Sequence, residues 1–174
     1  MQTTPETQLH DEYAIYQTIL HARNRRLTHD YEINTEDTPE NFQRDMLLGY
    51  CHENSLAAAE HLAEHYDPII VWGALTDKDD FHPDTRLEAE QNGLVHFWIE
   101  LEDDEPEPIV AEIATETTTV TGTLPGDPLV MRGRPNDYTV PDNCRFQYDP
   151  AIHSKDLCNE EGYRKLVGNG HRLS

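Results

Sequence analysis

Apolar residues recur at helical spacing in three stretches of the N-terminal third of the chain. Thr-Pro followed by Glu is a helix-start signal, and the apolar positions after the first such signal predict a helix over residues 4–27. A second Thr-Pro-Glu predicts a helix over 39–48, which Gly49 ends. A third helix is predicted to begin around Cys51 and to run to residue 66, before an Asp-Pro pair.

The pattern then changes to that of strands. Residues 69–75 are apolar almost throughout, which predicts a buried strand. Residues 94–101 alternate, so that His96, Trp98 and Glu100 share one face and the apolar residues between them share the other. An acidic turn over 102–107 should lead into a strand over 108–115. Weaker patterns predict strands over 117–123, 129–132 and 143–148, and a short helix over 155–167.

The two strands on either side of the acidic turn predict a specific contact. If their hairpin is centred on Asp104, then His96 and Glu112 stand opposite each other on the ladder. Directly opposed residues have Cβ atoms about 5 Å apart, which is close enough for the carboxylate to accept a hydrogen bond from the imidazole. A slip of one residue would place the two on opposite faces.

Helices first and consecutive strands afterwards indicate an α+β fold. A chain of 174 residues without an internal repeat suits one domain, 1–174. The polar segment 76–92 between two predicted strands is either a flap over a site or an ordinary surface loop, and the latter is the simpler interpretation.

The charge of the chain excludes several kinds of partner. Its 34 acidic and 13 basic residues give a net charge of -21, spread along the sequence. Nucleic acids and anionic membranes require clustered Lys and Arg, so neither is expected as a partner. Such an acidic surface is typical of a salt-rich cytoplasm, where salt screens the repulsion; an ordinary acidic protein is the alternative. No apolar run reaches 18 residues and no signal-peptide pattern begins the chain, so we expect no membrane insertion and a cytoplasmic location.

Three of the predicted elements carry residues that could act together as a catalytic site. Cys51 lies at a helix N-terminus, where the helix dipole favours thiolate, the nucleophilic form. His96 supplies a base, and Glu112 supplies an acceptor that orients it. An oxyanion would need donors, for which the backbone N–H of Cys51 and the side chains of Gln43 and Tyr50 are candidates.

The remaining cysteines and histidines point to weaker alternatives. Cys144 and Cys158 form no CxxC motif with Cys51 or with each other, and a disulfide framework is not expected. His61, Glu64 and His65 spell H-x-x-E-H, an inverted zinc-peptidase motif. A metal site there needs a distant third ligand, and an exposed helix face explains the same pattern, so no cofactor is expected.

The motifs together resemble one known family. Gly49-Tyr50-Cys51 opening a helix, His96-Phe97-Trp98-Ile99-Glu100 on a strand and an acid on the next strand resemble the transglutaminase-like branch of the papain-like cysteine enzymes. The resemblance covers residues 45–115 and implies that Cys51 is the nucleophile, His96 the base and Glu112 the orienting acid. The family usually has Asp where Glu112 stands.

The activity that this resemblance implies is thiol-dependent hydrolysis or acyl transfer at a peptide or amide bond, with a peptide or protein as substrate. Trp98 would line the cleft or pack beneath it. The alternative is a non-catalytic structural or binding protein with the same fold, for instance a component of a virus particle or of a cellular assembly of a halophile.

Overall fold

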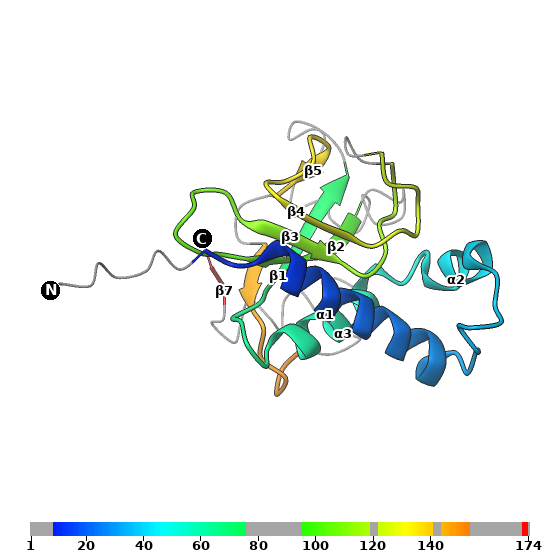
Figure 1. Ribbon diagram of the computed structural model, residues 1–174. Helices are drawn as coiled ribbons and strands as arrows, with labels where there is room; N and C mark the ends of the chain where they lie inside the picture. Colours follow the sequence, from blue (N-terminus) through cyan, green and yellow to red (C-terminus); the bar gives the residue numbers. More distant parts are fainter. Residues whose placement is uncertain (1–8, 76–94, 119–121, 141–143, 154–171, 174) are drawn as a thin grey trace, which may run out of the picture.

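The computed structural model describes residues 9–75, 95–118, 122–140, 144–153 and 172–173 (Figure 1). The helices are α1 (Glu12–Arg25), its π-helical continuation η1 (Arg26–Asp30), α2 (Glu40–Leu47) and α3 (Cys51–Leu62). The strands are β1 (Ile69–Leu75), β2 (Val95–Leu101), β3 (Ile109–Glu112), β4 (Leu129–Arg132), β5 (Tyr138–Thr139), β6 (Arg145–Gln147) and β7 (Arg172–Leu173).

The strands form one sheet in the order β4-β3-β2-β1-β6-β7, and β5 pairs with the end of β1. Neighbouring strands are antiparallel throughout the described part of the sheet. Helices α1 and α3 lie along the same side of this sheet, whereas α2 extends beyond one end of it (Figure 1). The predicted α+β architecture is therefore confirmed, with the helix that begins at Cys51 packed on an antiparallel sheet.

Element boundaries follow the sequence pattern closely in the middle of the chain. β1 and β4 occupy the predicted ranges, and α3 begins at Cys51 as expected. The first helix begins at Glu12 rather than at residue 4, because the side chain of Asp11 accepts the Tyr13 N–H and caps the helix there. The described residues contain no helix long and apolar enough to cross a membrane.

Some predicted elements are absent or lie elsewhere. The described residues of the predicted strand 117–123, namely 117, 118, 122 and 123, are not in a strand. Segment 76–92, the predicted helix 155–167 and Cys158 lie outside the described residues.

The sheet is buried on both faces, which explains how a polar group can be enclosed in it. On the helical side, Phe97, Ile99 and Leu101 join the cluster formed with α1 and α3. On the other side, Trp98 belongs to a second apolar cluster with strands β1, β3, β4 and β5. The predicted alternation of β2 is confirmed, and it places His96, Trp98 and Glu100 away from the helical cluster.

Trp98 lies against the backbone of β1. A Cβ added at Gly73 would meet the Trp98 ring at 2.2 Å and the Thr139 carbonyl oxygen at 2.7 Å. Only glycine leaves room for this close approach between the indole and the strand. Gly73 therefore sets how deeply Trp98 enters the sheet.

The register of the β2–β3 hairpin differs from the prediction by two residues. Leu101 pairs with Ile109 and Ile99 with Ala111, so the hairpin is centred on Glu105 rather than on Asp104. Two more residues than predicted therefore lie between Leu101 and its partner. Asp103 lies in this turn, and its carboxylate binds Arg132 of β4 at 2.7 Å. An even shift keeps every side chain on its predicted face.

Candidate active site

The corner before α3 presents Cys51 at the first position of the helix. Gly49 has φ of 81°, a left-handed conformation that ends α2 and turns the chain toward α3. Asn54 ties the first turn of α3 to this corner, because its Nδ2 donates to the Leu47 carbonyl at 3.0 Å. Arg26 Nε in turn donates to Asn54 Oδ1 at 2.8 Å. The backbone N–H of Cys51 is among the helix-start donors for which the helix has no acceptor.

Glu112 holds the imidazole of His96. His96 Nε2 donates to Glu112 Oε1, and the Tyr138 hydroxyl donates to Glu112 Oε2. His96 is completely buried and Glu112 nearly so. Burial, followed by the negative charge of Glu112, raises the pKa of Tyr138, which therefore stays a hydroxyl donor. The ring of His96 is thus fixed through one nitrogen by a carboxylate that is itself held in place.

The shifted register explains why a glutamate serves here. The last pair of this ladder is Ile99 with Ala111. If the pairing is extended by one residue, Glu112 stands opposite Trp98 and diagonal to His96. Diagonal neighbours on one face are farther apart than opposed ones, at about 7–8 Å between Cα atoms, which a long side chain can span. The predicted contact is therefore made, but by a diagonal route that the longer glutamate side chain permits.

The other nitrogen of His96 faces the thiol. Cys51 Sγ, one His96 ring nitrogen and one Glu116 carboxylate oxygen all lie within 4.8 Å of one another. Since Nε2 is bonded to Glu112, Nδ1 is the nitrogen left for Cys51, and this buried atom has no hydrogen-bond partner of normal geometry. Burial lowers the pKa of His96, but the charge of Glu112 and the neighbouring thiol of Cys51 outweigh it and raise that pKa to about 10.

Glu116 is a further acid at the site, and the sequence pattern did not single it out. Its carboxylate accepts the Gly49 N–H, at 3.0 and 3.2 Å to its two oxygens. Burial raises the pKa of Glu116, against the opposing effects of His96 and the Gly49 N–H. In a chain with 34 acidic residues no local signal marks this one, because it reaches Cys51 only through the tertiary fold.

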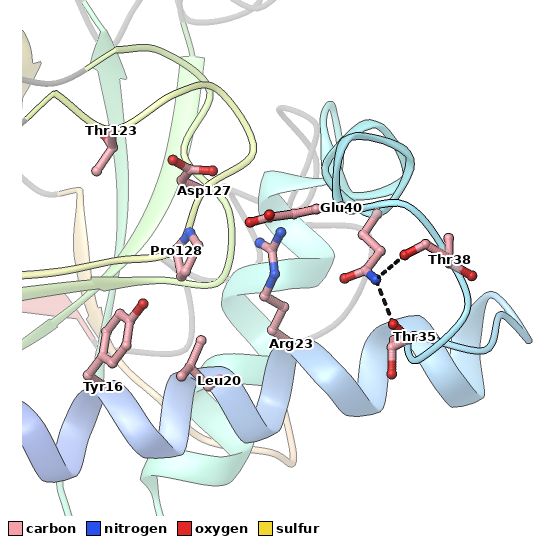
Figure 2. Close-up of a pocket in the computed structure, with 10 residues that line it drawn as sticks. Tyr16, Leu20, Arg23, Thr35, Thr38, Glu40, Thr123, Asp127 and Pro128 are labelled. Atoms are coloured by element: carbon pink, nitrogen blue, oxygen red, sulfur yellow. Dashed lines mark hydrogen bonds between the residues drawn. The ribbon is translucent and has the colours of Figure 1, made fainter.

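The structure places the two proposed side-chain oxyanion donors differently. Gln43 donates its amide hydrogens to the carbonyls of Thr35 and Thr38, both at 2.9 Å, and lines a pocket between α1 and the loop before β4 (Figure 2). The amide hydrogens of Gln43 are therefore used within this loop. The ring of Tyr50 packs edge-on against Tyr31, with ring centroids 5.7 Å apart, and Tyr50 is 44% exposed. The backbone N–H of Cys51 and the side chain of Tyr50 remain candidate donors.

Trp98 does not line a cleft. Its side chain is fully buried, and its Nε1 donates to Glu100 Oε2 at 2.9 Å. The ring centroid lies 5.8 Å from that of His96 and 4.7 Å from that of Tyr138. The indole therefore packs beside the imidazole and supports it.

In the described part of the chain, the residues of the H-x-x-E-H motif are not gathered into one cluster. Helix α3 ends at Leu62, so Glu64 and His65 lie in the turn after it rather than on one helix face with His61. His61 Nδ1 donates to the Ala57 carbonyl at 3.0 Å. Within the described ranges, the potential ligand atoms of His61, Glu64 and His65 are not gathered closely enough to hold an ion.

Compared with family models, with curated proteins and with solved structures, the chain matches none of them. The site therefore has to be interpreted from its own geometry.

The raised pKa of His96 leads to a prediction for stability. A group whose pKa is raised on folding stabilises the folded state below its ordinary value, 6.5, and loses that effect as the pH rises through about 10. We expect the free energy of unfolding to fall by a few kcal/mol between pH 7 and pH 10.5. Urea denaturation across this range measures the slope.

A variant isolates the part due to His96. His96→Gln should flatten the slope, while His61→Gln, which removes a partly exposed histidine, should keep it. An unchanged slope in His96→Gln would show that other groups cause the pH dependence.

Proposed function

We propose that this protein is a thiol-dependent hydrolase or acyltransferase that acts on a peptide or amide bond. Cys51 is the nucleophile, His96 the base and Glu112 the residue that orients the base. The observation that carries the proposal is the placement of His96: one ring nitrogen is bonded to a buried carboxylate, and the imidazole lies beside Cys51, with a ring nitrogen within 4.8 Å of the sulfur. This is the arrangement that nucleophilic catalysis by a thiol requires.

The proposed reaction has two steps. His96 Nδ1 takes the proton of the Cys51 thiol, and the sulfur attacks the carbonyl carbon of the substrate. His96 returns the proton to the leaving amine, which leaves a thioester on Cys51. Water or a second amine then attacks the thioester, and the thiol is regenerated. The oxyanion of each step is within reach of the backbone N–H of Cys51, at the positive end of α3.

The position of His96 beside Cys51 also supports a thiolate nucleophile. With Nε2–H held by Glu112, His96 can carry a second proton on Nδ1, and its raised pKa favours that form. An imidazolium beside the sulfur and a helix N-terminus beneath it both stabilise a thiolate. The thiolate is the form that reacts with carbonyl carbons and with alkylating agents.

The resemblance to the transglutaminase-like enzymes agrees with this proposal in the order and kinds of the three residues. The structure has the same general class of fold, with a helix packed on an antiparallel sheet, but the family itself remains part of the proposal. A halophilic source, cellular or viral, stays a prediction that rests on the acidic composition.

One observation favours the alternative of a non-catalytic structural or binding protein. His96 has no exposed surface and Cys51 is only partly exposed, so the described part of the chain offers a substrate limited access to the pair. In that case Cys51, His96 and Glu112 would form a polar network that stabilises the sheet. Reactivity of Cys51 toward a small reagent distinguishes the two functions.

Alkylation by iodoacetamide is the test. In metal-free protein at high salt, we expect Cys51 to be alkylated well below pH 8, and His96→Ala to abolish this reaction at low pH. Mass spectrometry of each cysteine reports the rates separately. Cys144, which is fully buried, is the internal control and should react slowly at every pH. If Cys51 reacts no faster than Cys144, the enzymatic function is ruled out and the structural one is preferred.

A further inference from the structure

Three side chains that metal ions bind converge beside α3. Cys51 Sγ, one nitrogen of His96 and one oxygen of Glu116 lie within 4.8 Å of one another, and the described residues hold no second group of this kind. We propose that these three residues bind one Zn²⁺ ion. The binding goes beyond the proposed acyl transfer, because it uses Glu116 and requires no turnover.

The ligand set and its spacing fit zinc. Thiolate, imidazole and carboxylate are the three ligand types that Zn²⁺ takes, at about 2.3 Å for sulfur and about 2.0–2.2 Å for nitrogen and oxygen. A tetrahedral ion with these bonds holds its ligand atoms about 3.5 Å apart. The observed group is therefore within roughly one ångström of a bound geometry. Cys51 and Glu116 are partly exposed, so their side chains can rotate to close that difference.

The atom that points most directly to a ligand is His96 Nδ1. It belongs to a fully buried side chain beside the Cys51 thiol and has no hydrogen bond of normal geometry, although buried polar atoms normally have one. A metal ion bonded to Nδ1 would satisfy it. The ring is already oriented for this, because metal-binding histidines characteristically donate their other nitrogen to a carboxylate, as His96 Nε2 does to Glu112.

The other ligands are supported in a similar way. The Gly49 N–H holds the Glu116 carboxylate, and the Tyr138 hydroxyl holds Glu112 behind His96. Such outer hydrogen bonds fix the ligand positions and add to metal affinity. Two of the three proposed ligands, the Glu116 carboxylate and the His96 imidazole, are therefore each held by a partner of their own.

Charge also favours a cation between these residues. The Cys51 sulfur and a Glu116 carboxylate oxygen lie within 4.8 Å of each other, and both are ligands that bind Zn²⁺ in their anionic forms. Zn²⁺ neutralises both charges, and three protein ligands leave the fourth position of the ion for water.

Zinc would also regulate the thiol. A metal-bound sulfur and a metal-bound Nδ1 are no longer available as nucleophile and base, so Zn²⁺ would inhibit acyl transfer reversibly. This consequence rests on the proposed function, whereas the binding itself does not.

Cobalt titration tests the binding directly. The 174-residue protein is freed of metal by dialysis against a chelator and titrated with Co²⁺, which occupies zinc sites and absorbs visible light. We expect one equivalent to bind with a thiolate-to-cobalt charge-transfer band and the intense visible bands of tetrahedral Co²⁺, and one equivalent of Zn²⁺ to remove both. Cys51→Ser should lose the charge-transfer band.

The variants Glu116→Gln and Glu53→Gln form a matched pair. Glu116→Gln keeps an acceptor for the Gly49 N–H but removes the charged ligand, so we expect at least about a tenfold loss of Zn²⁺ affinity. Glu53→Gln removes an acid from the first turn of α3 that is outside the group, and affinity should stay the same. Binding without the thiolate band, or equal affinities in both variants, would overturn the proposal.

A measurement on the unaltered protein covers the case in which a variant fails to fold. One equivalent of Zn²⁺ should protect Cys51 from iodoacetamide, and excess chelator should restore the reaction. Alkylation at the same rate with and without Zn²⁺ would also overturn the site. If the metal-free protein shows a reactive Cys51 but no cobalt band, only the zinc site fails. A cobalt band in a protein without amide turnover would instead contradict the enzymatic function alone.

Discussion

Cys51→Ala is expected to abolish acyl transfer, with turnover of a peptide or amide substrate falling by at least about 10³-fold. The reason is that alanine offers no atom on which the thioester can form, so both steps of the proposed reaction are lost together. Hydrolysis of a panel of fluorogenic peptide amides by metal-free protein at high salt measures the effect. A burst of product in the first turnover would additionally report the thioester.

The two supporting residues should show graded losses. His96→Ala removes the base and should approach the effect of Cys51→Ala, because residues that act as a unit are not additive. Glu112→Gln keeps a side chain of similar size but no longer a carboxylate, so we expect a loss on the order of 10² to 10⁴. A double variant of Cys51 and His96 should be little worse than either single one.

Cys144→Ala is the control for this series. Cys144 is a fully buried cysteine outside the triad, and its loss should leave turnover unchanged. Turnover by Cys51→Ala at the rate of the unaltered protein would eliminate the proposed mechanism. Loss of turnover in all variants except Cys144→Ala, with their folds intact by circular dichroism, would support it.

The second large effect concerns stability. Glu100→Ala is expected to lower the free energy of unfolding by about 3–5 kcal/mol. Glu100 is fully buried on β2, where it accepts hydrogen bonds from Arg134 Nε at 2.5 Å and Nη2 at 2.8 Å and from Arg145 Nε at 3.1 Å. The Trp98 indole donates to the same carboxylate. Removing it leaves the buried Trp98 N–H without its acceptor. It also takes the buried counter-charge away from Arg134, which is partly exposed, and leaves Arg145 with its pair to the exposed Glu102.

Glu102→Ala provides the matched comparison. Glu102 also binds Arg145, through Nη2, but its side chain is 56% exposed. An exposed ion pair is screened by water and salt and contributes about 1 kcal/mol or less. Urea denaturation of both variants measures the difference. Equal losses would mean that the burial of Glu100 adds nothing to the strength of its ion pairs.

Glu100→Ala also separates packing from chemistry at the site. Trp98 lies between Glu100 and His96 on the same face of β2, so loosening its indole should reduce turnover without changing which cysteine reacts. The reactive residue, identified by alkylation, should remain Cys51.

The sequence by itself determined the elements that surround the site. The apolar run of β1, the alternation of β2 and the glycine before Cys51 are local patterns, and each acts through the backbone within a few residues. That is why β1 has the predicted bounds, α3 starts at Cys51, and His96 and Glu112 share a face. The first helix begins at Glu12 because Asp11 caps it there, and residues 4–8 of the predicted helix lie outside the described residues.

The tertiary structure decided how those elements meet. The salt bridge between Asp103 and Arg132 joins a turn to a distant strand, and the β2–β3 register differs by two residues from the predicted one. No local pattern could reveal either feature. Tyr138 behind Glu112 and Glu116 beside Cys51 likewise come from segments that carry no sequence signal of their own. Their positions follow from long-range strand pairing and burial, since those forces depend on contacts between residues far apart in the chain.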